Sequence, residues 1–332
     1  MNYPNATIDL APEHEVGQLG IKQLKRFWGT LLLQRSGQLN GHDLAHEWQL
    51  NKTLLAALGL GLEPVMIYAM QNQPTFEEFE NWVIATAGLP SPLSVARFND
   101  IVDGEHRDGN QFEPFLTNEQ QACWDEQGYV IIPNVVSREQ CDETIEVICN
   151  HIGIKRDDPK TWYTQHPARQ GIMVQLFKHP VLQRNREAHS IRRAYEHVWQ
   201  RKDIWQNTDR VGFNPPETSS WHFPGPRLHW DCKPEPPIPF GTQGILYLAD
   251  TEANQGAFTL VPGFQHKVDN WLSALPAGTA IHQMDLYALG TKPIVAKAGD
   301  FIIWQQALPH GSSPNRSAKP RFVHYINYEP AG

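Results

Sequence analysis

The feature that most constrains the fold is a series of short strand-like runs in the second part of this 332-residue chain. After residue 205, β-branched and aromatic stretches alternate with turns rich in glycine and proline. Such a series is typical of an antiparallel barrel or sandwich and argues against a parallel βαβ sheet. We expect the main strands at residues 244–249, 257–261, 293–296, 301–304 and 321–328.

The first hundred residues follow a helical pattern instead. Apolar residues recur at helical spacing between residues 15 and 60, and Thr75 with Glu78 forms a capping-box pattern that predicts a further helix start. The chain is therefore expected to be mainly β with flanking helices, plus a small N-terminal α-helical domain. The predicted division is a helical domain at 1–97, a linker at 98–114 and a second domain at 115–332.

Composition excludes several kinds of partner. With 28 Lys and Arg against 36 Asp and Glu, the formal net charge is −8, which makes a nucleic-acid backbone a poor partner. No run approaches eighteen apolar residues, so we expect no membrane span, and no secretory signal pattern opens the chain. The four cysteines show no CxxC spacing, which favours reduced thiols and a cytoplasmic protein. The glycine-rich loops of nucleotide-binding folds are also missing from the sequence.

A histidine and a carboxylate stand two residues apart at His229 and Asp231. In an extended segment these two side chains point the same way, so they can hold one metal ion together. His310, which closely follows an expected strand, is a candidate third ligand. Two histidines and one carboxylate form the ligand set of non-haem Fe(II) oxygenases, which leaves open positions for a bidentate co-substrate and dioxygen.

Two further features bear on this interpretation. His106 and Asp108 have the same spacing, but they lie in the polar linker with no strand after them, and we interpret them as coincidence. Arg321 begins the last expected strand, eleven residues after His310. Arginine grips carboxylates with two parallel hydrogen bonds. A dicarboxylic keto acid that chelates iron at one end needs such a residue at its other end.

Several ordered blocks of residues together resemble a known family. They are Gly128-Tyr-Val-Ile-Ile-Pro133, His229-Trp-Asp231, Gln255-Gly-Ala-Phe-Thr-Leu-Val-Pro-Gly263, Gly299-Asp-Phe-Ile-Ile-Trp304 and His310-Gly-Ser-Ser-Pro-Asn-Arg316, followed by Arg321. On these blocks, residues 116–330 resemble the phytanoyl-CoA dioxygenase (PhyH) family of Fe(II)/2-oxoglutarate-dependent oxygenases.

The resemblance implies a double-stranded β-helix, that is, a jelly-roll or cupin-like barrel, with Fe(II) in its mouth. It implies that the metal ligands are His229, Asp231 and His310. It further implies that Arg321 binds 2-oxoglutarate with help from Ser312, and that Tyr247 and Gln175 line the co-substrate site. The implied function is hydroxylation of a small-molecule metabolite by Fe(II), 2-oxoglutarate and dioxygen, with release of succinate and CO2.

Other functions remain open at this point. Related halogenases have a small residue where this chain has Asp231, so the carboxylate favours hydroxylation, although desaturation and ring closure use the same ligands. A cupin-like metalloenzyme that does not use 2-oxoglutarate has no need of Arg321. A non-catalytic binding module is the third alternative, and the N-terminal helices could serve a homo-oligomer. Possible substrate contacts are Arg169, Trp221, His222 and Arg227, whereas Trp230 is expected to pack and His324 to be a core histidine.

Overall fold

The computed structural model describes residues 10–39, 44–105, 112–276 and 278–331. Within these limits the chain divides into two compact units. The helical unit comprises residues up to 112 together with 199–208 and 329–332, and the barrel unit comprises 113–198 and 209–328. The predicted division into domains at 1–97 and 115–332 stays a prediction. The predicted linker is wrong at its start, because residues 98–102 belong to a helix and Phe98 is buried.

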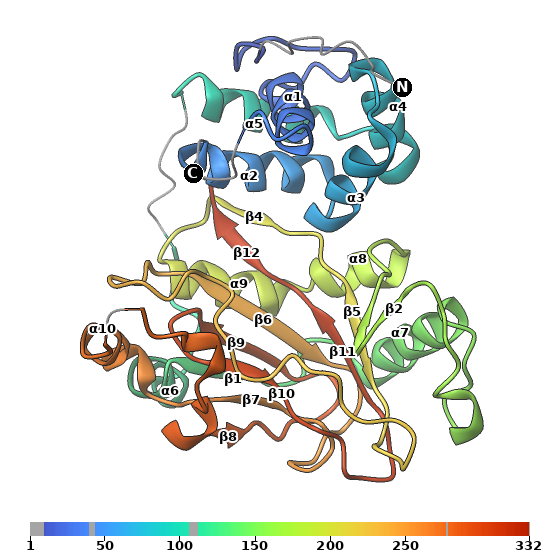
Figure 1. Cartoon of the computed structure of the whole chain (residues 1–332), viewed down its shortest axis with the longest axis vertical. Coiled ribbons are helices and arrows are strands. Elements are labelled where there is room, and N and C mark those ends of the chain that lie inside the picture. Colours follow the sequence, from blue (N-terminus) through green and yellow to red (C-terminus); the bar gives the residue numbers. More distant parts are fainter. Residues whose placement is uncertain (1–9, 40–43, 106–111, 277, 332) are drawn as a thin grey trace. The chain divides into compact units, whose positions relative to one another are not determined.

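Five α-helices form the described part of the helical unit (Figure 1). Thr75 and Glu78 form the predicted capping box at the start of the fourth helix, and Ser91 caps the fifth, which has a proline at its first position. The sequence patterns indicated the first two helices and the fourth but not the third and fifth. The helices are α1 (Leu24–Arg35), α2 (Trp48–Leu58), α3 (Leu62–Asn72), α4 (Phe76–Ala87) and α5 (Pro92–Val102), with a 3-10 turn at Ala45–Glu47.

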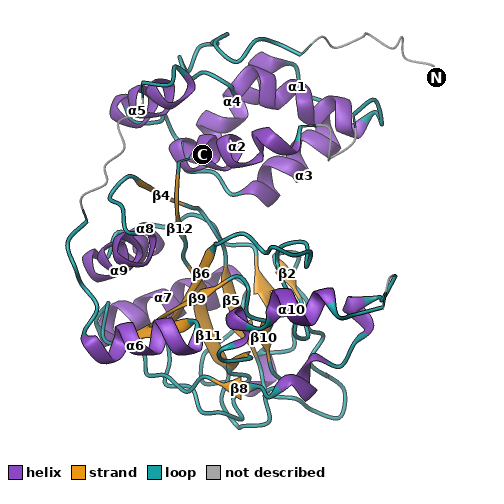
Figure 2. Ribbon diagram, turned by 90° about the vertical axis from the view of Figure 1, so that its left-hand side faces the viewer, coloured by secondary structure: helices purple, strands orange, loops and turns teal. Residues whose placement is uncertain are grey.

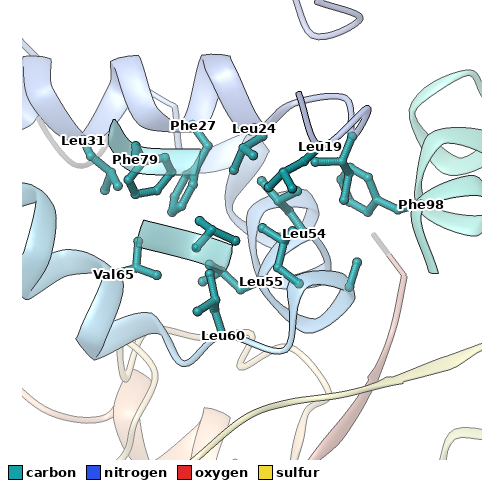
Figure 3. Close-up of a cluster of buried hydrophobic side chains, with 14 of the residues drawn as sticks. Leu19, Leu24, Phe27, Leu31, Leu54, Leu55, Leu60, Val65, Phe79 and Phe98 are labelled. Carbon is teal, nitrogen blue, oxygen red and sulfur yellow. The ribbon is translucent and has the colours of Figure 1, made fainter. Parts of the chain in front are cut away.

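The core of the helical unit is built from apolar side chains on facing helices (Figure 3). Leu24, Phe27, Val65 and Phe79 are among its fully buried members. Trp205, far away in sequence, completes this core. It lies on strand β4 (Ile204–Gln206), which pairs with β12 (Tyr328–Pro330). The helical unit therefore takes part of its core from residues beyond the first hundred.

The barrel unit is built around an antiparallel sheet of seven strands in the order β1-β9-β6-β11-β5-β3-β2. A second sheet, in the order β10-β7-β8, faces it in the jelly-roll arrangement that the sequence predicted. The strands of the larger sheet are β1 (Tyr129–Ile132), β2 (Arg169–Gln170), β3 (Met173–Val174), β5 (Val211–Asn214), β6 (Thr242–Tyr247), β9 (Phe301–Gln305) and β11 (Arg321–Tyr325). Those of the smaller sheet are β7 (Phe258–Leu260), β8 (Lys292–Pro293) and β10 (His310–Ser312).

Helices cover the outer face of the larger sheet, while the smaller sheet lies on the inner side (Figure 2). The outer helices are α6 (Asn118–Gln127), α7 (Arg138–His151), α8 (Pro180–Arg186) and α9 (His189–Trp199). A short helix, α10 (Val268–Ser273), follows the 3-10 turn Phe264–His266 after β7, and further 3-10 turns lie at Pro159–Thr161, Ile281–Gln283 and Leu286–Leu289.

The two faces of β11 carry different side chains because successive residues of a strand alternate in direction. Val323 packs in the inner core with Tyr247 of β6, its register partner. His324 points to the outer face, where Asn185 of α8 contacts its ring at 3.5 Å. Arg321 is two residues from Val323 and therefore shares the inner face.

Among the described residues, no single helix is long and apolar enough to cross a membrane. A bent pair formed by residues 45–58 and 62–72 passes the same test by length and composition only.

Candidate active site

His229, Asp231 and His310 meet at one point of the inner side of the barrel unit. The ligand atoms of the three side chains all lie within 4.8 Å of one another. Backbone pairing brings them together: His229 N–H donates to the His310 carbonyl at 2.9 Å, and His310 N–H donates to the His229 carbonyl at 3.0 Å. His310 opens β10, so this bridge attaches the segment that carries His229 and Asp231 to the edge of the smaller sheet.

The two imidazole rings are oriented by hydrogen bonds to the backbone. His229 Nδ1 lies 2.7 Å from the carbonyl oxygen of Arg227, and His310 Nδ1 lies 3.0 Å from that of Leu308. A carbonyl only accepts, so each Nδ1 carries the ring proton and each Nε2 is left as the ligand atom. Such outer hydrogen bonds fix the tautomer of metal-binding histidines.

The Nε2 atoms face the carboxylate of Asp231. His229 Nε2 is 3.3 Å from Oδ1, and His310 Nε2 is 3.1 Å from Oδ2. Lone pairs facing a carboxylate at these distances require a proton or a cation between them. The donor set therefore fits a divalent metal ion, and its composition is that of non-haem Fe(II) centres. Asp231 is 52 % exposed, whereas His310 is buried, so the cluster is open on the carboxylate side.

Electrostatics within the cluster follow from the same contacts. The hydrogen bond to Asp231 raises the pKa of His229 above its usual value, against the opposing effect of burial. Burial acts to raise the pKa of Asp231, but hydrogen bonding with His229 and His310 outweighs it and holds that pKa well below its usual range. In the metal-free protein the ionised carboxylate faces a proton on an imidazole Nε2, and a bound metal ion would take that proton's place.

Gly311 allows the close crossing of the two ligand-bearing segments. A Cβ atom added at this position would lie 2.8 Å from the carbonyl oxygen of Arg227, which is too close for real atoms. The same carbonyl accepts the hydrogen bond that orients His229. A glycine between His310 and Ser312 therefore permits the backbone approach on which the metal cluster depends.

Arg321 begins β11 and is completely buried. Its Nη2 donates to Ser312 Oγ at 2.9 Å, while Nε and Nη1 have no hydrogen-bond partner within the described part of the chain. Leaving buried charged donors unpaired is costly in free energy. The arrangement fits a carboxylate ligand that would accept from the two free nitrogens, and a dicarboxylic keto acid has such a group at its distal end.

Two phenol groups lie near Arg321. Burial raises the pKa of Tyr247 and of Tyr325, and the positive charge of Arg321 partly opposes this in both. The Tyr247 hydroxyl accepts from Phe258 N–H at 2.9 Å and donates to the Ile294 carbonyl at 3.2 Å. Both phenols are therefore neutral at physiological pH, and neither neutralises the guanidinium.

The structure brings most of the predicted site residues together in two groups. The triad forms one, and Arg321 with Ser312 and Tyr247 forms the other, with β10 carrying both His310 and Ser312. Gln175 follows β3, where its side-chain amide donates to Gln170 Oε1 at 3.0 Å. Its assignment to the co-substrate site stays a prediction. The second His-x-Asp pattern, at residues 106–108, lies outside the described residues.

Several other residues have definite places. Trp230 Nε1 donates to the Ala307 carbonyl at 2.9 Å and packs against the inner core, so the packing role predicted for it is confirmed. Arg169 donates to the Trp162 and Thr164 carbonyls and stacks on Phe213. Its guanidinium therefore has a structural role.

Sequence reasoning missed Gln243, whose Nε2 donates to Asp231 Oδ2. A signal was present in the sequence: Gln243 stands four residues before Tyr247 on one strand, so both point to the same face.

An antiparallel barrel with two histidines and one carboxylate at one point has the architecture of a non-haem Fe(II) oxygenase. Comparison with known proteins agrees. A model of the phytanoyl-CoA dioxygenase family matches residues 124–323, more than half of the chain. The chain therefore belongs to this family. It is a non-haem Fe(II)- and 2-oxoglutarate-dependent oxygenase, and its cofactors are Fe(II), 2-oxoglutarate and dioxygen.

Individual relatives are distant. A putative phytanoyl-CoA dioxygenase of Dictyostelium discoideum is 24 % identical over 256 residues, covering 61 % of this chain and 72 % of the relative. Among solved structures, the epimerase SnoN from nogalamycin biosynthesis is 15 % identical, with a TM-score of 0.47 over 64 % of this chain and 82 % of SnoN. Iron-bound EctD from S. alaskensis is 16 % identical, with a TM-score of 0.47 over 68 % of this chain and 82 % of EctD. The family assignment rests on the family match alone.

Proposed function

We propose that this oxygenase hydroxylates a small-molecule metabolite with release of succinate and CO2, and that His229, Asp231 and His310 hold its Fe(II). The observation that carries the proposal is the carboxylate of Asp231 at the third ligand position, within 4.8 Å of both imidazole ligand atoms. With these three protein ligands, the bound metal would keep room for 2-oxoglutarate and dioxygen. Because Asp231 occupies the position at which related halogenases have a small residue, hydroxylation is favoured over halogenation.

The chain's own residues have separate tasks. Bound Fe(II) supplies dioxygen activation coupled to oxidative decarboxylation of 2-oxoglutarate. The two imidazoles and Asp231 fix the metal against β10. Arg321 binds the distal carboxylate of 2-oxoglutarate, and the Ser312 hydroxyl orients the guanidinium by accepting from Nη2. Tyr247 lines the same buried space and contributes an apolar ring and a neutral hydroxyl.

A cupin-like enzyme that does not use 2-oxoglutarate is the weaker interpretation. Such an enzyme has no use for a buried arginine with two free nitrogens, and membership of an oxygenase family also disfavours it. No described contact identifies the substrate beyond its chemical class. A small molecule is supported by the family and by the solvent accessibility of Asp231, the exposed member of the triad.

Location and assembly are proposed on separate observations. All four cysteines are unpaired, which supports a reducing compartment such as the cytoplasm. Leu89, between α4 and α5, and Leu93, in the first turn of α5, are 76 % and 79 % exposed, which supports the N-terminal helices as a homo-oligomer contact. Light scattering of the wild type and of Leu93→Asp tests this: a dimer that dissociates supports it, and a monomeric wild type contradicts it.

The proposed site is tested by anaerobic titration of the metal-free protein with Fe(II) and then 2-oxoglutarate. We expect the weak visible charge-transfer band of the chelate to saturate at one equivalent. His310→Ala should abolish it, whereas the control His266→Ala should retain it, because His266 is an exposed histidine that contacts the Asp125 carbonyl. A band that survives in His310→Ala would contradict the ligand assignment. Absence of a band in an iron-loaded wild type would contradict the proposed co-substrate chemistry.

A further inference from the structure

Gln243 links the metal cluster to the core of the larger sheet. It lies on β6 directly opposite Trp304 of β9, its register partner. Its side chain contacts both neighbours: Nε2 donates to Asp231 Oδ2, and Oε1 accepts from Trp304 Nε1 at 3.0 Å. A continuous chain of hydrogen bonds thus runs from a buried indole through one amide to the carboxylate of the triad.

The direction of this chain is set by chemistry. An indole N–H can only donate, so the amide oxygen of Gln243 must face Trp304. The amide nitrogen then has to face Asp231, where an ionised carboxylate can only accept. Trp304 therefore removes the ambiguity between the two orientations of the amide and ensures that Asp231 meets a donor.

Trp304 is itself held firmly. It is 2 % exposed, and its ring lies 4.2 Å from that of Phe258 and 5.2 Å from that of His310, measured between ring centroids. The same indole thus packs against one metal ligand and, through Gln243, orients another. Neither Gln243 nor Trp304 is a proposed metal ligand, so both would affect the metal only through the ligand residues that they contact.

We propose that Gln243, oriented by Trp304, is a positioning residue that fixes the Asp231 carboxylate by holding its Oδ2. In the orientation held this way, each carboxylate oxygen faces the ligand atom of one imidazole. A carboxylate free to rotate would present its oxygens differently to a bound metal. This inference rests on the proposed metal site and adds the residue pair that determines how its carboxylate is presented.

Gln243→Leu tests the proposal, because it removes both hydrogen bonds at similar side-chain size. We expect the dissociation constant for Co(II) to rise about 10- to 100-fold, the usual effect of losing an outer partner of a metal ligand. The d–d absorption bands of bound Co(II) should change as well, because they report the number and arrangement of ligand atoms. The metal-free variant should stay folded, although its thermal unfolding midpoint should fall because the buried Trp304 N–H loses its acceptor.

The matched control is Gln183→Leu. Gln183 is exposed on α8 and donates from its amide to Glu187 Oε1 at 2.7 Å, so it makes the same kind of hydrogen bond away from the triad. Its loss should leave Co(II) binding unchanged.

Trp304→Phe supplies a second test in case Gln243→Leu does not fold. It keeps an aromatic ring in the core and removes the N–H group together with part of the indole ring system. Because one neutral hydrogen bond is lost, we expect Co(II) binding to weaken by about two- to tenfold.

The possible outcomes distinguish the positioning role of Gln243 from the proposed metal site. Co(II) binding by Gln243→Leu equal to that by Gln183→Leu would overturn the positioning role while the metal site stands. Weaker Co(II) binding with d–d bands identical to those of the wild type would also overturn it, because the arrangement of the ligand atoms would then not depend on Gln243. Failure of the wild type to bind Co(II) would instead overturn the proposed metal site itself.

Discussion

The barrel unit buries two arginines completely, one on each side of the larger sheet, and they are partnered differently. Arg186, at the end of α8 on the outer side, donates through Nη2 to the Phe177 carbonyl at 2.8 Å and to the Asp209 carbonyl at 2.7 Å. Arg321, on the inner face of β11, donates only to the Ser312 hydroxyl, and two of its three nitrogens have no partner within the described residues.

This difference separates a structural arginine, Arg186, from Arg321, which we propose binds a ligand. Backbone carbonyls are fixed acceptors, so Arg186 ties α8 to the loop before β5 in every state of the protein. Burial lowers the pKa of Arg186 to about 10, which still leaves it charged at neutral pH. Arg321 has free charged donors in a dry interior, a state that is unfavourable until an anion arrives. Arg186 also leaves its Nε without a partner within the described residues, so a buried arginine indicates a ligand only where the fold leaves most of its nitrogens unpaired.

The largest expected effect comes from breaking the structural arginine. Arg186→Leu leaves two buried carbonyls without donors, and each such loss costs about 1–3 kcal/mol. We expect the free energy of unfolding to fall by about 2–6 kcal/mol. Urea unfolding of the metal-free protein measures this. An unchanged urea midpoint would show that Arg186 does not stabilise the folded state.

Arg321→Leu should give the opposite profile. Charge-assisted hydrogen bonds contribute about 1.5–3 kcal/mol, so the dissociation constant for 2-oxoglutarate should rise by one to two orders of magnitude, roughly 10- to 100-fold. Metal-free stability should not fall, because an unpaired buried charge is replaced by an apolar side chain. Anaerobic co-substrate titration and urea unfolding of the same preparation test both halves. A loss of stability like that of Arg186→Leu would erase the distinction between the two arginines.

His324, on the outer face of the larger sheet, should make the stability of the folded protein depend on pH. This histidine is fully buried next to Arg186, and burial followed by the charge of Arg186 holds its pKa well below the usual value. The unfolded chain takes up a proton below about pH 6.5, and the folded chain resists it. Stability should therefore be full above pH 6.5 and fall below it, by up to about 1.4 kcal/mol per pH unit.

The His324→Leu variant provides the comparison for this pH dependence. Unfolding free energies at pH 7.5 and pH 5.5 should differ less in the variant than in the wild type. An identical pH dependence in the two proteins would rule out His324 as the source.

The smallest expected effect belongs to Ser312, which accepts a single hydrogen bond from Arg321. Ser312→Ala should weaken 2-oxoglutarate binding by about two- to tenfold, since a net hydrogen bond contributes about 0.5–1.5 kcal/mol. The same titration measures it, with Ser317→Ala, at an outer turn, as control. An effect as large as that of Arg321→Leu would show that the hydroxyl binds the ligand directly and is not only a support.

Much of the barrel could be predicted from the sequence. The strand expected at 301–304 is β9, and the helix expected after Ser137 is α7. The strand expected at 321–328 is β11 only as far as Tyr325, because Tyr328 begins β12 in another sheet. These segments carry strong apolar runs bounded by turn or cap residues. Short strands such as β3 and β10 have no such pattern, because they are two or three residues long and are defined by their partners. Trp205 could not be placed in the helical unit from sequence, since only tertiary packing brings it there.

The candidate site likewise contains residues that the sequence predicts and residues that only the tertiary structure brings together. Residue type and spacing were enough to single out the three candidate ligands and Arg321, because the required chemistry limits the choice of side chains. The pattern did not indicate Gln243 or Tyr325, whose significance comes from which atoms their strands bring near Asp231 and Arg321. Hydrogen-bond partners across strands depend on register, which a single sequence does not specify.

The central claim is that Arg321 recognises the distal carboxylate of the keto acid bound at the triad. The most direct test compares anaerobic binding of 2-oxoglutarate and of pyruvate, which lacks that carboxylate, to the Fe(II)-loaded wild type and Arg321→Leu. We expect the wild type to prefer 2-oxoglutarate by roughly 10- to 100-fold, and the variant to bind both equally weakly. A preference that persists undiminished in Arg321→Leu would contradict the account and place the distal carboxylate elsewhere in the barrel.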